Sequence, residues 1–334
     1  MRVCGPFSTG RRKGMRSTHW ITALALVACG TNAAAQATKF PLKPVRMVVG
    51  FSAGGATDII SRALGPGLSE GLGQSVVIEN RPGASSQIAG DVVAKSPPDG
   101  HVIMMTTQTL MTSVMIERKT FPDILKDFAH VGLVATSTLI LVVNPSFPVK
   151  SVKDLIALAR SRPGEINYAS GGVGTTPHLS GELLATMGKL KFVHVPYKGE
   201  APALTDIMGG HVPFMFSNVS ASSQFVKSGK LRALASTGLK PSPAMPDLPT
   251  MAASGLPGFE VVGFFGILAP AKTPPEVVSR LNAELVKVLA RPDIKKLYAS
   301  QALEPGNMSP SQFADYIKVE KGRWGKLIQE AGIK

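Results

Sequence analysis

Two glycine-rich loops are the stretches of this sequence best suited to bind an anion. In the first, Gly54 and Gly55 follow the apolar run Val45–Val49 and precede an amphipathic segment that begins at Asp58. Glycine lacks a Cβ atom, so the backbone can turn sharply and approach a ligand closely. A helix after such a loop points unpaired N–H groups and the positive end of its dipole at the loop, a setting for carboxylate, phosphate or sulfate. An ordinary strand-to-helix turn is the competing interpretation.

The second loop, residues 170–177, repeats this order of strand, glycines and helix. It holds three glycines together with the hydroxyls of Ser170, Thr175 and Thr176. Two such loops, one in each half of the chain, could bind the two ends of a dianion. The alternative is a flexible loop in which Thr175 or Thr176 caps the helix. Neither loop has the spacing of a nucleotide-binding glycine motif.

Residues for catalysis or metal binding are less well organised. His178 and Glu182 have the i, i+4 spacing used in metal sites, but no third ligand is placed clearly, and a capping or surface pair is the preferred interpretation. Asp58 and Asp206 could act as paired carboxylates, although spacing does not show that they meet. The sequence has no G-x-S-x-G elbow. We therefore expect no metal, no cofactor and no enzymatic activity.

Alternating strand and helix patterns position these loops. They predict two doubly wound α/β domains with a ligand cleft at the carboxyl ends of their strands. Strands near Leu141 and Ile267 carry the chain out of the first domain and back. The first domain is thus expected over residues 38–143 and 263–334, and the second over 144–262. The predicted strands are 45–49, 75–79, 101–107, 131–135, 139–143, 166–169, 191–195, 212–216, 231–236 and 263–270.

Composition and the N-terminus indicate an exported globular protein. The 334 residues are 44% hydrophobic and carry a net charge of +14, which suits an anionic partner; basic residues are not clustered with aromatic ones, so no nucleic acid is expected. Residues 1–37 resemble a signal peptide with an A-x-A site at Ala35–Ala37. Leu26–Cys29 resembles a lipobox, so lipidation of Cys29 stays open, as does a start at Met1 or Met15. Cys4 and Cys29 both lie in this leader, which leaves the mature chain without disulfides.

Motifs along nearly the whole mature chain resemble the Bug family of extracytoplasmic solute receptors, the binding proteins of tripartite tricarboxylate transporters. Their order and spacing both fit. The matching stretches are 49–55 with Asp58 and Arg62, 79–84, 98–100, 142–145, 167–170, 178–183, 195–199, 202–204, 229–235 and 331–334.

This resemblance implies a periplasmic-binding-protein-like fold of type II, with two domains closing on a solute like a Venus flytrap. It implies a periplasmic monomer that carries a small organic anion, a carboxylate, to the subunits of a membrane transporter. A ligand-presenting sensor subunit is an alternative in the same fold. A hydrolase or transferase using the same cleft is the alternative of another class.

The resemblance also carries ligand contacts over to particular positions. Three departures from the family pattern touch the pocket and leave the solute unnamed: Ser85-Ser86 in place of Gly-Gly, Phe264 where Trp is common, and Ser217-Asn218 in place of Asp-Asn. The expected contacts are Phe51, Ala53, Gly54, Gly55, Asp58, Ser85, Ser86, Thr107, Gln108, Ser170, Gly174, Thr175, His178 and Asn218.

Overall fold

The computed structural model describes residues 40–117, 122–242 and 244–333. The predicted signal peptide, Met15 and Cys29 lie outside these residues. The chain from Phe40 onward forms one compact unit. Within the described ranges, no helix combines the length and the apolar character needed to cross a membrane.

Strands and helices alternate along the chain, as the sequence pattern predicts. The strands are β1 (Val45–Val49), β2 (Val76–Asn80), β3 (Val102–Thr107), β4 (Phe128–Val143), β5 (Asn167–Ser170), β6 (Val193–Pro196), β7 (Phe214–Asn218), β8 (Arg232–Ser236), β9 (Val262–Pro270) and β10 (Leu303–Pro305). The helices are α1 (Ala56–Leu72), α2 (Gln87–Ala94), α3 (Thr109–Glu117), α4 (Val152–Ser161), α5 (Thr176–Gly188), α6 (Glu200–Met208), α7 (Val219–Lys227), α8 (Pro275–Leu289), α9 (Pro292–Ser300) and α10 (Pro310–Glu330), with a 3-10 turn at Ala84–Ser86.

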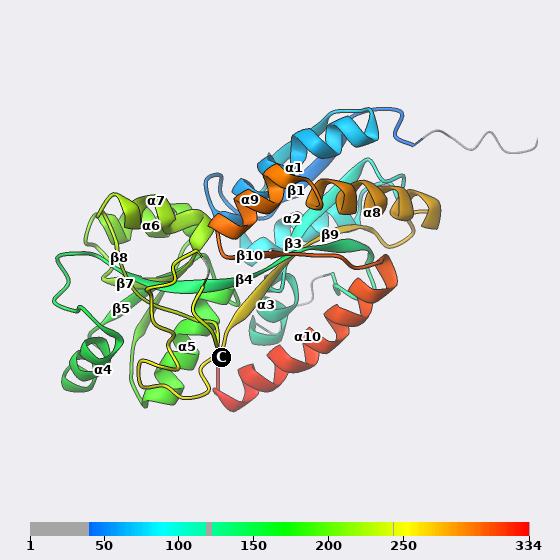
Figure 1. The fold of residues 1–334 in the computed structure, drawn as a ribbon. Helices are drawn as coiled ribbons and strands as arrows, with labels where there is room; N and C mark the ends of the chain where they lie inside the picture. Colours follow the sequence, from blue (N-terminus) through cyan, green and yellow to red (C-terminus); the bar gives the residue numbers. More distant parts are fainter. Residues whose placement is uncertain (1–39, 118–121, 243, 334) are drawn as a thin grey trace, which may run out of the picture. The chain divides into compact units, whose positions relative to one another are not determined.

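Strand β4 joins two α/β halves. Its first part pairs antiparallel with β9, and its last five residues pair with β7 and β8. Strands β1, β2 and β3 are parallel to one another, as are β5, β6 and β7. We call β1–β3, β9, β10, α1–α3 and α8–α10 the first half, and β5–β8 with α4–α7 the second half. Figure 1 shows β4 and β9 passing between the two groups. The exact domain boundaries stay a prediction.

The prediction of two separate strands at 131–135 and 139–143 is wrong, because both belong to the single strand β4. The polar residues between them interrupt the apolar run but do not end the strand. Ser137 pairs with Gly263 of β9, and its hydroxyl donates to the Asn218 side chain at 2.9 Å. A buried hydroxyl with a partner is tolerated inside a sheet.

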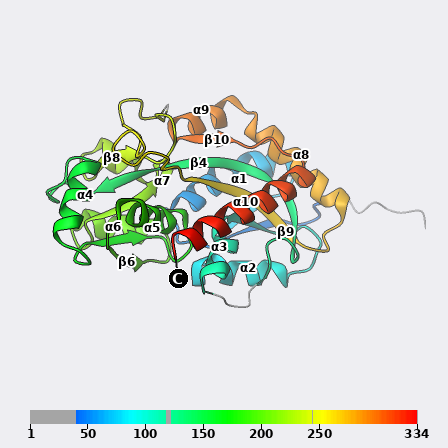
Figure 2. The same ribbon diagram turned by 90° about the horizontal axis from the view of Figure 1, so that it is seen from below.

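The hydrophobic core has two layers, one on each face of the sheet. Alternate residues of β4 enter opposite layers: Leu139 and Leu141 lie with helices α2–α5 and α10, whereas Ile140 and Val142 lie with α1 and α6–α9. This alternation follows from the two-residue period of a strand. Figure 2 shows α10 lying along β4, with which it is in contact.

Helices α3 and α9 and strand β10 were not predicted. Helix α3 buries Thr109, Leu110, Thr112 and Ser113 alike, so its sequence has no polar stripe to reveal the helical period. Strand β10 has three residues and pairs with β4, which only the assembled sheet supplies.

Candidate functional site

A cavity lies between the two halves, at the carboxyl ends of the parallel strands. Its volume is about 40 Å³. Loops after β1, β3, β5 and β7 reach it, together with β9. This is where α/β folds place their ligands. Its lining consists of Phe51, Gly55, Ala56, Thr57, Thr107, Gln108, Thr109, Gly171, Thr175, Thr176, Pro177, Glu200, Asn218, Gly263, Phe264 and Phe265.

Five helices begin at this cavity. Gly55, Thr175 and Asn218 precede α1, α5 and α7, and Thr109 and Glu200 are the first residues of α3 and α6; all five line the cavity. Each helix start brings N–H groups without helical partners and a partial positive charge. The convergence follows from the chain order, because each strand ends at the cleft and its helix starts there. The arrangement favours an anion without using a cationic side chain.

The two halves touch above and beside the cavity. The N–H of Ser52 donates to the carbonyl of Lys198 at 3.1 Å, and the hydroxyl of Thr112 donates to the carbonyl of Gly174 at 2.6 Å. A Cβ atom on Gly174 would lie 2.6 Å from the backbone nitrogen of Ser113, so the two halves approach closely at this point as well. The structure therefore represents a closed arrangement.

The first glycine loop is held from behind by Asp58. Its carboxylate accepts hydrogen bonds from the N–H of Gly54 at 2.9 Å, from the side chain of Arg62 at 3.0 Å and from that of Asn80 at 2.9 Å. Burial acts to raise the pKa of Asp58, but these donors outweigh it and hold the pKa below its ordinary value. Gly54 has φ +80°, which favours glycine. Asp58 thus fixes the loop that carries Gly55 to the cavity.

The second glycine loop is held by its own helix. Nδ1 of His178 accepts the N–H of Gly174 at 3.1 Å, while Thr175 caps the helix and donates to Gly172 at 2.7 Å. Burial, aided by the neighbouring His194, lowers the pKa of His178 to about 3. The neutral ring is therefore a hydrogen-bond acceptor. Glu182 accepts the hydroxyl of Tyr168 at 2.6 Å.

Glu200 places a buried carboxylate inside the cavity. Its side chain accepts both the N–H and the side-chain amide of Asn218, at 3.0 and 2.9 Å, and the N–H of Ala56 at 3.4 Å. Burial raises the pKa of Glu200, and these three donors act against that shift. Of the described residues that line the cavity, Glu200 alone has an ionisable side chain.

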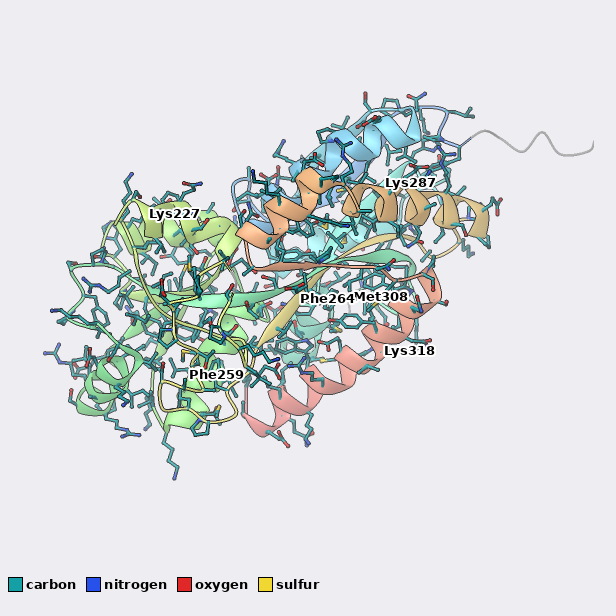
Figure 3. The ribbon with its side chains drawn as sticks, in the orientation of Figure 1. Lys227, Phe259, Phe264, Lys287, Met308 and Lys318 are labelled. Carbon is teal, nitrogen blue, oxygen red and sulfur yellow. The ribbon has the colours of Figure 1, made fainter. Side chains whose placement is uncertain are left out.

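Aromatic side chains and Gln108 complete the cavity. The Gln108 side-chain oxygen accepts the N–H of Phe264 at 3.2 Å, which ties the loop after β3 to β9. Phe51 and Phe265 add apolar surface. Figure 3 labels Phe264, which lies where β9 passes between the two halves.

Six of the predicted contact residues line the cavity, and the other eight do not. Ser85 faces Gly172 of the second half, and the buried hydroxyl of Ser86 lies against Gly50. Contact of each residue with a solute stays a prediction. Those that line the cavity are Phe51, Gly55, Thr107, Gln108, Thr175 and Asn218; those outside its lining are Ala53, Gly54, Asp58, Ser85, Ser86, Ser170, Gly174 and His178.

Asp58 and Asp206 have separate partners in the described structure. Asp206 accepts the hydroxyl of Tyr197, whose pKa is raised to about 12 by burial and by this carboxylate. The interpretation of the two acids as a catalytic pair therefore has no support from their contacts. No group of three or more His, Cys, Asp or Glu side chains able to hold a metal occurs among residues 40–117, 122–242 and 244–333.

The sequence analysis missed several lining residues, of which Glu200 is the most informative. A signal was present, because Val195–Glu200 is a further strand, glycine and helix start, although with one glycine. In this stretch the carbonyl of Lys198 accepts the N–H of Ser52. The lining residues that lay outside both the expected contacts and the second glycine loop are Ala56, Thr57, Thr109, Glu200, Gly263 and Phe265. Gly171, Thr176 and Pro177 belong to that predicted loop but were not among the expected contacts.

Comparisons with known proteins assign the family. Residues 60–333 match the model of the tripartite tricarboxylate transporter family receptor, and the chain belongs to this family. It is 39% identical over 313 residues to a UPF0065 protein in the tcbD-tcbE intergenic region of Pseudomonas sp. strain P51, covering 92% of each chain. The predicted family membership is confirmed.

Solved structures support the same assignment. R. palustris Rpa4515 with adipate has a TM-score of 0.86 and 39% identity, covering 88% of this chain and 99% of that one. The periplasmic binding protein BugD has a TM-score of 0.84 and 33% identity over 88% and 99%. MatC (Rpa3494) from Rhodopseudomonas palustris with bound malate has a TM-score of 0.82 and 28% identity over 86% and 100%. The predicted periplasmic-binding-protein-like fold is confirmed, and the chain is a solute receptor of the transporter family.

Proposed function

We propose that this protein binds a small carboxylate-bearing solute in the cavity between its two halves and delivers it to a tripartite tricarboxylate-type membrane transporter. The observation that carries this proposal is the convergence of five helix N-termini on a cavity whose lining has no Lys, Arg or His. Backbone N–H groups at helix starts bind carboxylates without a cationic partner. The adipate and malate bound by two structural relatives support the same solute class.

We propose that opening and closing of the halves admits the solute. The cavity is small, and hydrogen bonds such as Thr112 to Gly174 close it, so a solute would enter when the halves part. Binding then stabilises the closed state by its differential affinity. Strands β4 and β9 connect the halves, which makes them the candidate hinge. On this proposal the moving domains are residues 38–143 with 263–334, and 144–262.

We also propose that the mature protein acts in the periplasm as a monomer and performs no catalysis. The family relation to a periplasmic binding protein supports the compartment. This proposal has two versions: either signal peptidase removes residues 1–37, or Cys29 is lipidated. Intact mass of the exported protein separates them, because lipidation would retain Cys29 and add acyl chains.

Thermal-shift screening of carboxylates followed by calorimetry tests the proposed function. A ligand that binds only the native state raises the melting temperature in a concentration-dependent manner. Native mass spectrometry of the protein as purified should reveal a retained organic acid. Absence of binding across mono-, di- and tricarboxylates contradicts the proposal, and turnover of a bound compound contradicts a purely binding role.

A further inference from the structure

Glu200 already occupies a position in which the fold would hold an anion. Its two oxygens accept N–H groups from Ala56, the first residue of α1, and from Asn218, which precedes α7. The Asn218 side chain adds a third donor. These are the donors that a bound carboxylate would use at the same helix starts.

The Glu200 carboxylate also spans the two halves. Glu200 and Asn218 belong to the second half, whereas Ala56 belongs to the first, and the residue is only 8% exposed. The other residues that line the cavity are uncharged, and Phe51, Phe264 and Phe265 give it apolar surface. The Glu200 carboxylate therefore offsets part of the positive potential at the helix N-termini.

We infer that Glu200 selects a solute that has a single carboxylate. The part of this solute that lies beside the Glu200 side chain carries an N–H or O–H donor. This inference rests on the proposed function and names the solute class of that same cavity. Three N–H donors stabilise the ionised form of Glu200. A second solute carboxylate beside it would be repelled, because like charges repel more strongly in a buried site than in water. A neutral amide in the same place can donate to Oε2, which has one long hydrogen bond at 3.4 Å.

Matched pairs of diacids and their monoamides test this inference. Calorimetry on the full mature protein compares succinate with succinamate, glutarate with glutaramate, and adipate with adipamate, so that chain length varies separately from charge. We expect the wild type to bind the monoamide at least tenfold more tightly than the diacid of the best-fitting length. In Glu200→Gln the ratio should fall to near one or reverse, because the fixed charge is gone.

Two further variants separate charge selection from loss of structure. Glu200→Ala removes the carboxylate and its bulk, and should also shift preference towards the diacid. Glu284→Gln changes a buried carboxylate of α8 that pairs with Arg280 and Lys287 and does not line the cavity. It should leave the ratio unchanged.

The outcomes distinguish this inference from the proposed function. Equal affinity of the wild type for diacid and monoamide overturns the role of Glu200. The same holds if both Glu200 variants keep the wild-type ratio of monoamide to diacid affinity. The carboxylate receptor function stands in either case. No binding of any acid by the wild type overturns both.

Discussion

The hydroxyl of Thr112 in α3 donates a hydrogen bond to the carbonyl of Gly174 in the second glycine loop, across 2.6 Å. The two residues are 62 positions apart and belong to opposite halves of the molecule. This bond joins the loop after β5 to the first half, beside the cavity. The same loop lines the cavity with Gly171, Thr175 and Thr176, so a contact between the halves and the cavity wall share one loop.

Thr112→Val should weaken solute binding by favouring the open arrangement. The substitution keeps the side-chain shape but removes a hydrogen bond between the halves, worth about 0.5–1.5 kcal/mol, which corresponds to roughly a two- to thirteenfold loss of affinity. Calorimetry measures the affinity, and small-angle scattering measures the open fraction. Thr205→Val, on the exposed part of α6, is the matched control. Equal affinities for the two variants would contradict a role for this bond in closure.

Gly174→Ala should oppose closure and lower solute affinity more than Gly164→Ala, although both place an alanine at a positive φ. Gly174 has φ +75°, and a Cβ atom there would lie 2.6 Å from the backbone nitrogen of Ser113 in the opposite half. The strained backbone, about 1–2 kcal/mol, lowers stability in this variant and in its control alike. We expect a loss of affinity above about tenfold, or about 1.4 kcal/mol, because the new Cβ atom would keep the loop away from Ser113 and so oppose closure. Gly164→Ala is the control, because φ is +79° and no atom lies within 4 Å. It should lose stability but keep its affinity; similar affinity losses in both variants would refute the steric explanation.

Asp58→Asn should destabilise the first glycine loop. The amide cannot accept all the donors that the carboxylate accepts from Gly54, Arg62 and Asn80. We expect a decrease of about 1–3 kcal/mol in the free energy of unfolding, measured by urea denaturation. Asp91→Asn, which breaks an exposed pair with Lys95, should change it by less than about 1 kcal/mol. An equal change in the two variants would show that Asp58 does not brace the loop.

Acidification should destabilise the protein through His178 and His194. Burial lowers their pKa values to about 3 and about 4, below the ordinary value of 6.5, and the ring centroids are 4.1 Å apart. At a pH between 6.5 and these folded-state pKa values, each histidine takes up a proton when the protein unfolds. The stability that the two neutral histidines contribute is therefore fully present above pH 6.5 and is lost as the pH falls. For His178 the loss between pH 7 and pH 4 is on the order of 3 kcal/mol.

Urea denaturation at pH 7, 5.5 and 4.5 measures this effect in the wild type and in His194→Gln. Glu200 has the opposite effect: burial raises its pKa in the folded protein, so its contribution to the free energy of unfolding increases as the pH falls. Glu200 is present in both proteins, so its effect cancels in the comparison. Glu182, whose oxygen lies 3.8 Å from His178, is also common to both. The variant should show the shallower slope. Identical slopes would exclude His194 as a source of the acid sensitivity.

The sequence by itself determined the local units of this protein. The apolar run Val45–Val49 with Gly54 and Gly55 predicts β1 and the turn into α1, and residues 166–178 predict the equivalent unit in the second half. These signals are local, because strand period, glycine at positive φ and a Thr175 cap depend on neighbours in the chain. Motif order along the chain was sufficient to predict the family and the fold.

Only the tertiary structure decided how these units meet. Residues 131–135 and 139–143 became one strand because β9 and β7 pair with them, and Ala56 met Glu200 across 144 positions because the halves closed. Gly54 and Asp58 were predicted with Gly55 as contacts, yet Gly55 lines the cavity while Asp58 braces the loop. Long-range pairing and closure depend on surfaces that exist after folding, so no local pattern in the sequence encodes which residues of a loop line the cavity.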